Sequence, residues 1–140
     1  MNKNTITINC LAFQLSNARK KVQKWYEKKL ERLGLNTSYV YVMEVIKEFG
    51  PSSLSLIAEK IELERATVSN LLGRMERDGF IKRLPGKERR SMEVILTQKG
   101  NDILDEALFS LQQADIELDE LLVGNLDGIK DSIKVINAKL

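Results

Sequence analysis

Residues 63–83 read LERATVSNLLGRMERDGFIKR, and their apolar positions recur mostly every three or four residues. That spacing places the apolar side chains on one face of a helix. Gly79 follows the pattern and ends it, so we predict a helix from about Arg65 to Asp78. The outer face of this helix carries small, polar and basic residues. The residues predicted to be buried are Val68, Leu71, Leu72 and Met75.

A shorter helix precedes this one. Ser52 and Ser53 are of the residue type that caps helix N-termini, and the apolar residues after them repeat at helical spacing as far as Ile61. A break near Glu62 and Leu63 separates the two helices. Two short helices joined by a tight break, the second with hydrogen-bonding side chains outside, are typical of a helix-turn-helix.

The segment after Gly79 has apolar residues on both sides of a loop that contains Gly and Pro, which predicts a two-stranded hairpin. A hairpin directly after a helix-turn-helix is a wing. Residues 82–90, KRLPGKERR, contain five Lys or Arg against one Glu. A concentrated basic tract is the usual electrostatic footprint of nucleic-acid contact.

Amphipathic helices are predicted on either side of this region. One runs from about Leu11 to Gly34 and is basic, and two more begin near Lys99 and Leu126. Residues 101–122 contain seven Asp or Glu and no Lys or Arg, so the first of these two complements the basic helix in charge. A small winged helix offers too little surface to bury all three apolar stripes, and we therefore predict a homodimer.

Together these elements predict a mainly α fold: a winged helix-turn-helix core with a small β-hairpin wing, and N- and C-terminal helices that form a dimerisation lobe. We expect residues 1–36 to form the N-terminal dimerisation helix. Residues 37–100 are expected to form the winged helix-turn-helix DNA-binding domain, whose first helix ends at Gly50 and Pro51. Residues 101–140 are expected to form the C-terminal dimerisation helices, within one compact chain.

The composition excludes several kinds of catalytic site. The 140 residues include no His and one Cys, which rules out four-ligand Cys/His zinc sites, Ser-His-Asp and Cys-His catalysis, and intrachain disulfides. Asp119 and Glu120 diverge by about 100° on a helix and do not form a carboxylate pair. We expect no enzymatic activity, metal or cofactor. No run approaches ~18 apolar residues and no signal peptide is visible, so we expect a cytoplasmic protein without membrane contact.

The helix and wing segments together resemble the MarR family of bacterial winged-helix regulators. The resemblance rests on Gly79-Phe80-Ile81 after the second helix, on Glu88-Arg89-Arg90 in the wing, and on residues 96–100, LTQKG. The family usually has Asp where Glu88 stands, and this acid is expected to brace the wing rather than to touch DNA. The resemblance implies a homodimeric transcriptional regulator, a repressor or an activator with repression favoured, that binds palindromic double-stranded promoter DNA.

The resemblance and the exposed helix face together suggest the DNA contacts. Asn is suited to adenine, Arg to guanine, and Ala or a Thr methyl group to thymine. Ser53, at the start of the short helix that precedes the break at Glu62, is suited to a phosphate contact. The wing arginines are suited to phosphates or to the minor groove. The predicted DNA-binding residues are Ser53, Arg65, Ala66, Thr67, Ser69, Asn70, Arg74, Lys87, Arg89 and Arg90.

The resemblance also implies a signal that acts between the two lobes. A small aromatic or phenolic effector is expected near the junction of the first two long helices, with core and dimer packing as the alternative interpretation. The residues predicted for this pocket are Arg19, Trp25, Tyr26, Tyr39 and Tyr41.

Cys10 suggests a second kind of signal. Some relatives sense peroxide through a Cys directly before a Phe, but here Ala12 precedes Phe13, and Cys10 lies about 200° away around a helix. We expect a buried, unreactive thiol, and thiol sensing through Cys10 is the alternative. Two further alternatives to an effector-controlled regulator stay open, a docking module for proteins and an architectural DNA-binding protein.

Overall fold

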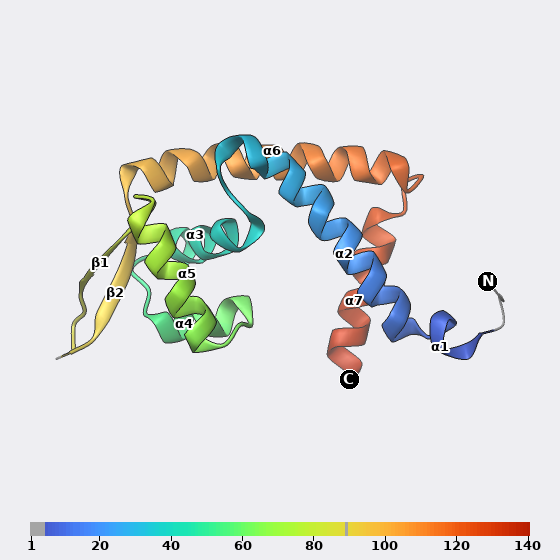
Figure 1. The fold of residues 1–140 in the computed structure, drawn as a ribbon, viewed down its shortest axis with the longest axis horizontal. Coiled ribbons are helices and arrows are strands. Elements are labelled where there is room, and N and C mark those ends of the chain that lie inside the picture. Colours follow the sequence, from blue (N-terminus) through green and yellow to red (C-terminus); the bar gives the residue numbers. More distant parts are fainter. Residues whose placement is uncertain (1–4, 89) are drawn as a thin grey trace.

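The computed structural model describes residues 5–88 and 90–140, and its main elements follow the predicted order (Figure 1). The elements are α1 (Ile6–Asn9), α2 (Leu11–Leu30), η1 (Glu31–Leu33), α3 (Thr37–Phe49), α4 (Leu54–Ile61), α5 (Arg65–Arg77), β1 (Ile81–Pro85), β2 (Met92–Leu96), α6 (Gln98–Leu121) and α7 (Leu126–Lys139). The winged helix-turn-helix occupies one end of the molecule, and the N-terminal part of α2 lies with α7 at the other (Figure 1). The predicted fold class is therefore confirmed, although α1 and the single 3-10 turn η1 were not predicted.

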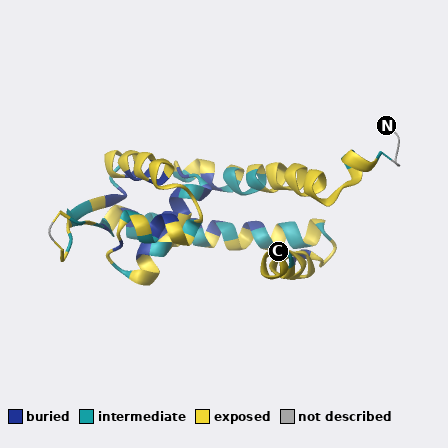
Figure 2. Cartoon of the chain, turned by 90° about the horizontal axis from the view of Figure 1, so that it is seen from below, coloured by how far each residue is buried: buried dark blue, intermediate teal, exposed yellow. Residues whose placement is uncertain are grey.

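The apolar core lies within the winged helix-turn-helix and against the first half of α6. Met43 of α3, Ile57 of α4 and Leu72 of α5 are almost completely buried there, and α6 adds Leu104 and Ala107. Figure 2 shows the buried residues gathered toward the end that holds the wing, whereas α1, the first half of α2 and most of α7 are exposed. Tertiary packing in this chain is therefore concentrated in one of its two lobes.

The wing is a two-stranded antiparallel sheet in which Ile81 lies opposite Leu96. A short third segment, which the sequence pattern did not indicate, pairs with it: Ser52 N donates to Val94 O (3.0 Å) and Val94 N donates to Ser52 O (2.8 Å). Ser52 is buried in this bridge, so the predicted pair of capping serines is corrected to Ser53 alone. The bridge fixes the start of the helix-turn-helix against the wing.

The turn after α5 packs closely against the start of α6. The Thr97 hydroxyl accepts a hydrogen bond from Gly100 N (3.0 Å) and donates one to the Gly79 carbonyl (2.6 Å). Gly100 is buried against Phe80, so a β-carbon at this position would lie 2.1 Å from the Phe80 carbonyl oxygen. The end of the helix-turn-helix and the start of α6 are therefore held together through the backbone.

The basic helix α2 packs against the acidic helix α6, as their charges predict. Lys29 forms an ion pair with Glu117, and Arg32 donates a hydrogen bond to the Ser110 hydroxyl (2.9 Å). An exposed ion pair contributes only about 0–1 kcal/mol, so this one adds little to the stability of the protein. Within the described part of the chain, we find no helix whose length and hydropathy would allow it to span a bilayer.

We predict that Gly100→Ala destabilises the protein by about 1–3 kcal/mol, because the added β-carbon overlaps a backbone carbonyl that cannot move away alone. Urea denaturation followed by circular dichroism measures this change. Gly73→Ala on α5 is the matched control, because nothing lies within 4 Å of a β-carbon there. Alanine is the better helix former, so the control is expected to gain about 0.5–1 kcal/mol. Equal effects of the two substitutions would contradict the proposed close approach.

Candidate nucleic-acid interface

Helix α5 is anchored in the core by one face and leaves the other in solvent. Its buried residues are the four that the apolar spacing predicted. All of its predicted DNA-binding residues are exposed, namely Arg65, Ala66, Thr67, Ser69, Asn70 and Arg74. A helix held in this way can enter a major groove without any loss of core packing.

The turn between α4 and α5 sets the angle at which the second helix emerges. Glu62 takes a left-handed conformation (φ 56°), and Leu63 N donates to the Ala58 carbonyl (3.1 Å). The Ser53 hydroxyl caps α4 by accepting a hydrogen bond from Leu56 N (3.1 Å). Ser53 is exposed at this helix N-terminus, and its hydroxyl proton remains to be donated to an anion.

The wing tip presents positive charge from a tight turn. Lys87 and Arg90 are both exposed, and Arg90 has a left-handed backbone (φ 68°). Arg89, the third predicted contact at this tip, lies outside the described residues. Figure 1 shows the hairpin projecting from the same end of the molecule as α4 and α5. The helix-turn-helix and the wing can therefore approach one ligand together.

Glu88 closes the tip through its main chain. Its carbonyl accepts hydrogen bonds from Ser91 N (3.1 Å) and from the Ser91 hydroxyl (2.7 Å), and Gly86 N donates to the Ser91 carbonyl (2.8 Å). Among residues 5–88 and 90–140, no hydrogen bond or ion pair of the Glu88 carboxylate is seen. The bracing contacts that the structure describes therefore use the carbonyl, which any residue supplies.

Arg83 connects the wing to α5. Its Nε lies 3.8 Å from Glu76 Oε1, and this buried nitrogen has no hydrogen-bond partner among the described residues. In the sequence, Arg83 is one of several basic residues of the tract from Lys82 to Arg90. In the structure it lies within the paired strands, opposite Val94, whereas Lys87 and Arg90 lie at the tip.

Asp78, at the end of α5, forms contacts with α3 and α6 that the sequence did not indicate. Its carboxylate accepts a hydrogen bond from the Tyr39 hydroxyl (3.0 Å), and its carbonyl accepts one from Lys99 Nζ (2.7 Å). The Tyr39 ring meets Phe80 edge-on, with centroids 5.9 Å apart. Burial, together with the hydrogen bond to Asp78, raises the pKa of the Tyr39 phenol and keeps it a donor.

The predicted effector pocket is not formed by its five residues. Trp25 Nε1 donates to the Ala114 carbonyl (3.1 Å), and Tyr26 donates to Asp115, so both side chains are bound to α6. Burial is the main cause that raises the pKa of the Tyr26 phenol. Of the other three residues, Tyr39 lies in the core and Arg19 is exposed on α2, while Tyr41 is half-exposed on α3, near enough to Tyr26 to contribute to its raised pKa. Tyr39 and Tyr41 lie two residues apart and so diverge by about 200° around α3, which is why closeness in sequence did not gather all five residues.

Cys10 lies between α1 and α2 and is exposed, so the expectation of a buried thiol is wrong for this chain. Its Sγ donates a weak hydrogen bond to the Thr7 carbonyl (3.1 Å). The residues of α1 and the first turns of α2 around it are largely exposed too, so no described part of the chain covers this thiol. The part of the chain that the structure describes contains no group of three or more His, Cys, Asp or Glu that could hold a metal ion.

An exposed recognition helix beside a basic wing defines the class of winged helix-turn-helix proteins. The MarR family profile matches residues 35–91, from the start of α3 to the wing. The HTH-type transcriptional regulator MgrA of Staphylococcus aureus is 30% identical over 98 residues, which are 69% of this chain and 67% of MgrA. The chain therefore belongs to the MarR family of DNA-binding transcriptional regulators, and it is a regulator rather than an enzyme.

Solved structures show the same fold. The M. tuberculosis transcriptional regulator MosR, in complex with DNA, has a TM-score of 0.79 and 24% identity, and the match covers 94% of this chain and 100% of that one. The transcriptional repressor CouR, bound to a 23-mer DNA duplex, has a TM-score of 0.86 and 20% identity, with 96% and 99% covered. At these identities the likeness establishes the winged-helix architecture.

Proposed function

We propose that this chain is a transcriptional repressor that binds palindromic double-stranded DNA as a homodimer. One observation carries the proposal: the exposed face of α5 bears small and hydrogen-bonding side chains, while a basic wing projects beside it. MosR and CouR, which share the fold, are bound to DNA in their solved structures. Exposed polar helix faces are common in proteins. Such a face beside a cationic wing is suited to double-stranded DNA, because DNA offers negatively charged phosphates together with base edges that can form hydrogen bonds.

The proposal gives separate tasks to the parts of this surface. The side chains from Arg65 to Arg74 read base edges in the major groove, where Asn70 is suited to adenine. Ser53 donates to a phosphate at the start of α4, and Lys87, Arg89 and Arg90 bind phosphates or the minor groove. Phosphate contacts position the protein, and base contacts supply its sequence preference.

The homodimer is supported by apolar surface that a single chain leaves uncovered. Leu11 and Leu15 of α2 face Ile129 and Ile133 of α7 across a groove of about 470 Å³, and these four residues are between 38% and 59% exposed. Only Leu126 of α7 is buried. A helix with so little packing is not stable alone in water, so a second copy that covers the groove is the simplest occupant.

Two copies also suit the proposed ligand. Recognition helices about 34 Å apart meet successive major-groove faces of one duplex, so a twofold dimer matches an inverted repeat. A second half-site then adds its contacts to the first without a second loss of translational freedom. In the proposed repressor role, the dimer occupies an inverted repeat that overlaps a promoter and so excludes the transcription machinery.

Asn70→Ala is expected to relax the preference at one base pair in each half-site by about 1–3 kcal/mol, because it removes a bidentate side chain. Selection of bound duplexes from a random pool, repeated with the variant, measures the preference at every position. An unchanged preference at all positions would show that Asn70 is only a surface residue.

Arg90→Ala is expected to act differently, because a phosphate contact carries no sequence information. It weakens binding to all duplexes alike and reduces the slope of log affinity against log salt concentration by about one unit. Titration of one duplex over a range of salt concentrations gives the slope. A slope equal to that of the wild type would place Arg90 away from the phosphates.

Ile133→Glu is expected to convert the dimer to a monomer and to abolish the advantage of an inverted repeat over a single half-site, because it places a charge in the apolar groove. Light scattering gives the mass in solution. Val135→Glu is the matched control, because Val135 is an exposed apolar residue of the same helix that does not line the groove. A dimeric Ile133→Glu protein would contradict this interface.

A further inference from the structure

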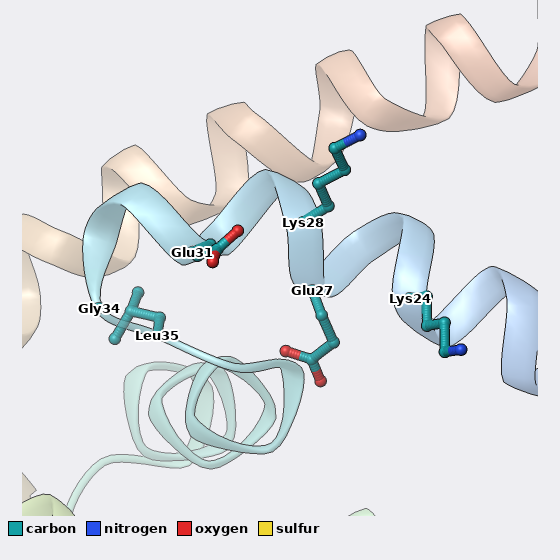
Figure 3. A pocket seen from close by; sticks show the side chains of 6 residues that line it. All are labelled: Lys24, Glu27, Lys28, Glu31, Gly34 and Leu35. Atoms are coloured by element: carbon teal, nitrogen blue, oxygen red, sulfur yellow. The ribbon is translucent and has the colours of Figure 1, made fainter.

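A polar contact joins α2 to the first turn of α3. The Glu27 carboxylate accepts hydrogen bonds from Thr37 N (3.3 Å to each oxygen) and from the Thr37 hydroxyl (3.0 Å). Gln23, one turn earlier on α2, donates to Glu27 and to the Thr37 hydroxyl (2.6 Å). Figure 3 shows the Glu27 side chain reaching from α2 toward α3. A carboxylate at a helix N-terminus also interacts favourably with the helix dipole.

The same turn of α3 is attached to the recognition helix. Tyr39 follows Thr37 by two residues, and its hydroxyl donates to the Asp78 carboxylate at the end of α5 (3.0 Å). Thr37 and Tyr39 are both buried, at 2% and 5% exposure. The first turn of α3 therefore has one directional contact to the N-terminal helix and another to the recognition helix.

These contacts differ in kind from the core that surrounds them. Apolar packing is non-directional and tolerates small rotations, whereas a hydrogen bond weakens steeply as its angle falls. Three elements, α2, α3 and α5, are connected in order by Glu27–Thr37 and Tyr39–Asp78. These two contacts therefore constrain the rotation of α5 relative to α2, in addition to the packing of both helices against α6.

We propose that Glu27 and Tyr39 are positioning residues that hold the recognition helix at a fixed orientation to the dimerisation helices, and that they thereby determine which spacing between half-sites the dimer accepts. This inference rests on the proposed function. Both residues act through α3 and α5 rather than by contact with DNA. A small rotation at this joint displaces each recognition helix, and a dimer doubles the resulting error in spacing.

The test uses the full-length protein and a set of inverted repeats that share the selected half-site and differ by one base pair in spacer length. The variants are Glu27→Ala, Tyr39→Phe and the double variant. Tyr41→Phe removes a hydroxyl from the half-exposed tyrosine on the same helix, and Glu31→Ala removes a carboxylate one turn after Glu27, so these two are the matched controls. Affinity for each spacer, for a single half-site and across salt concentrations is measured, with a melting curve for every protein.

Each test variant is expected to reduce the preference for the best spacer over its neighbours by about two- to tenfold, the net effect of one hydrogen bond. Single half-site affinity and the salt slope are expected to stay within about twofold of wild type, as are both controls. The double variant is expected to match the larger single effect, because both substitutions break one connection. If the two sites acted independently, the reduction in spacer preference of the double variant would instead equal the product of the two single reductions, to within about twofold.

Three results would overturn the inference. The first is an unchanged spacer preference in both single variants, and the second is an equal loss of affinity for every spacer and for the half-site, which indicates only a structural role. Should Glu27→Ala fail to fold, Glu27→Met, which keeps a side chain of similar length but removes both acceptor oxygens, replaces it in the same comparison. The third is wild-type protein that binds inverted repeats no better than random duplex, which removes the proposed function and this inference with it before any variant is examined.

Discussion

The close approach of the α6 backbone to the Phe80 carbonyl is the constraint on which the arrangement of this protein depends. Gly100 has no side chain and so allows the contact, and Thr97 completes it with hydrogen bonds to the preceding turn. The recognition helix ends here, the wing begins here, and the helix that leads to the other lobe starts here. A larger residue at this point would separate all three, so one glycine couples the DNA-facing lobe to the rest of the chain.

Most of the fold was readable from the sequence because the helices and the wing bury regular apolar patterns. The inner face of α5 and the presence of a hairpin after it follow directly from residue spacing. The contacts that orient the elements were not readable, since Tyr39–Asp78 and Ser52–Val94 join polar or backbone groups that are distant in sequence. The prediction that the aromatic residues form one effector pocket failed for the same reason. Trp25 donates a hydrogen bond to the Ala114 carbonyl on α6, and no local sequence pattern indicates such a contact.

The two lobes are held by different physical means. The winged helix-turn-helix is held by an apolar core that it shares with the start of α6, whereas the other lobe has charge complementarity between α2 and α6 and apolar side chains that face solvent. In the proposed homodimer a second copy covers this lobe, and association and folding of that half of the chain would then be linked. The exposed face of α5 and the wing beside it, in contrast, are formed within a single chain.

Helix α6 spans 24 residues, or about 36 Å at the rise of an α-helix, and it contacts both lobes without a break. Insertion of a single residue in its middle would turn everything after it by about 100°, which would move Ala114 away from Trp25 and Asp115 away from Tyr26. The wing tip lies at the end of a hairpin, and the hydrogen bonds described there, among Gly86, Glu88 and Ser91, stay within the tip itself. A change of length is therefore expected to be tolerated in the wing and to be disruptive in α6, whose length sets the register between the two lobes.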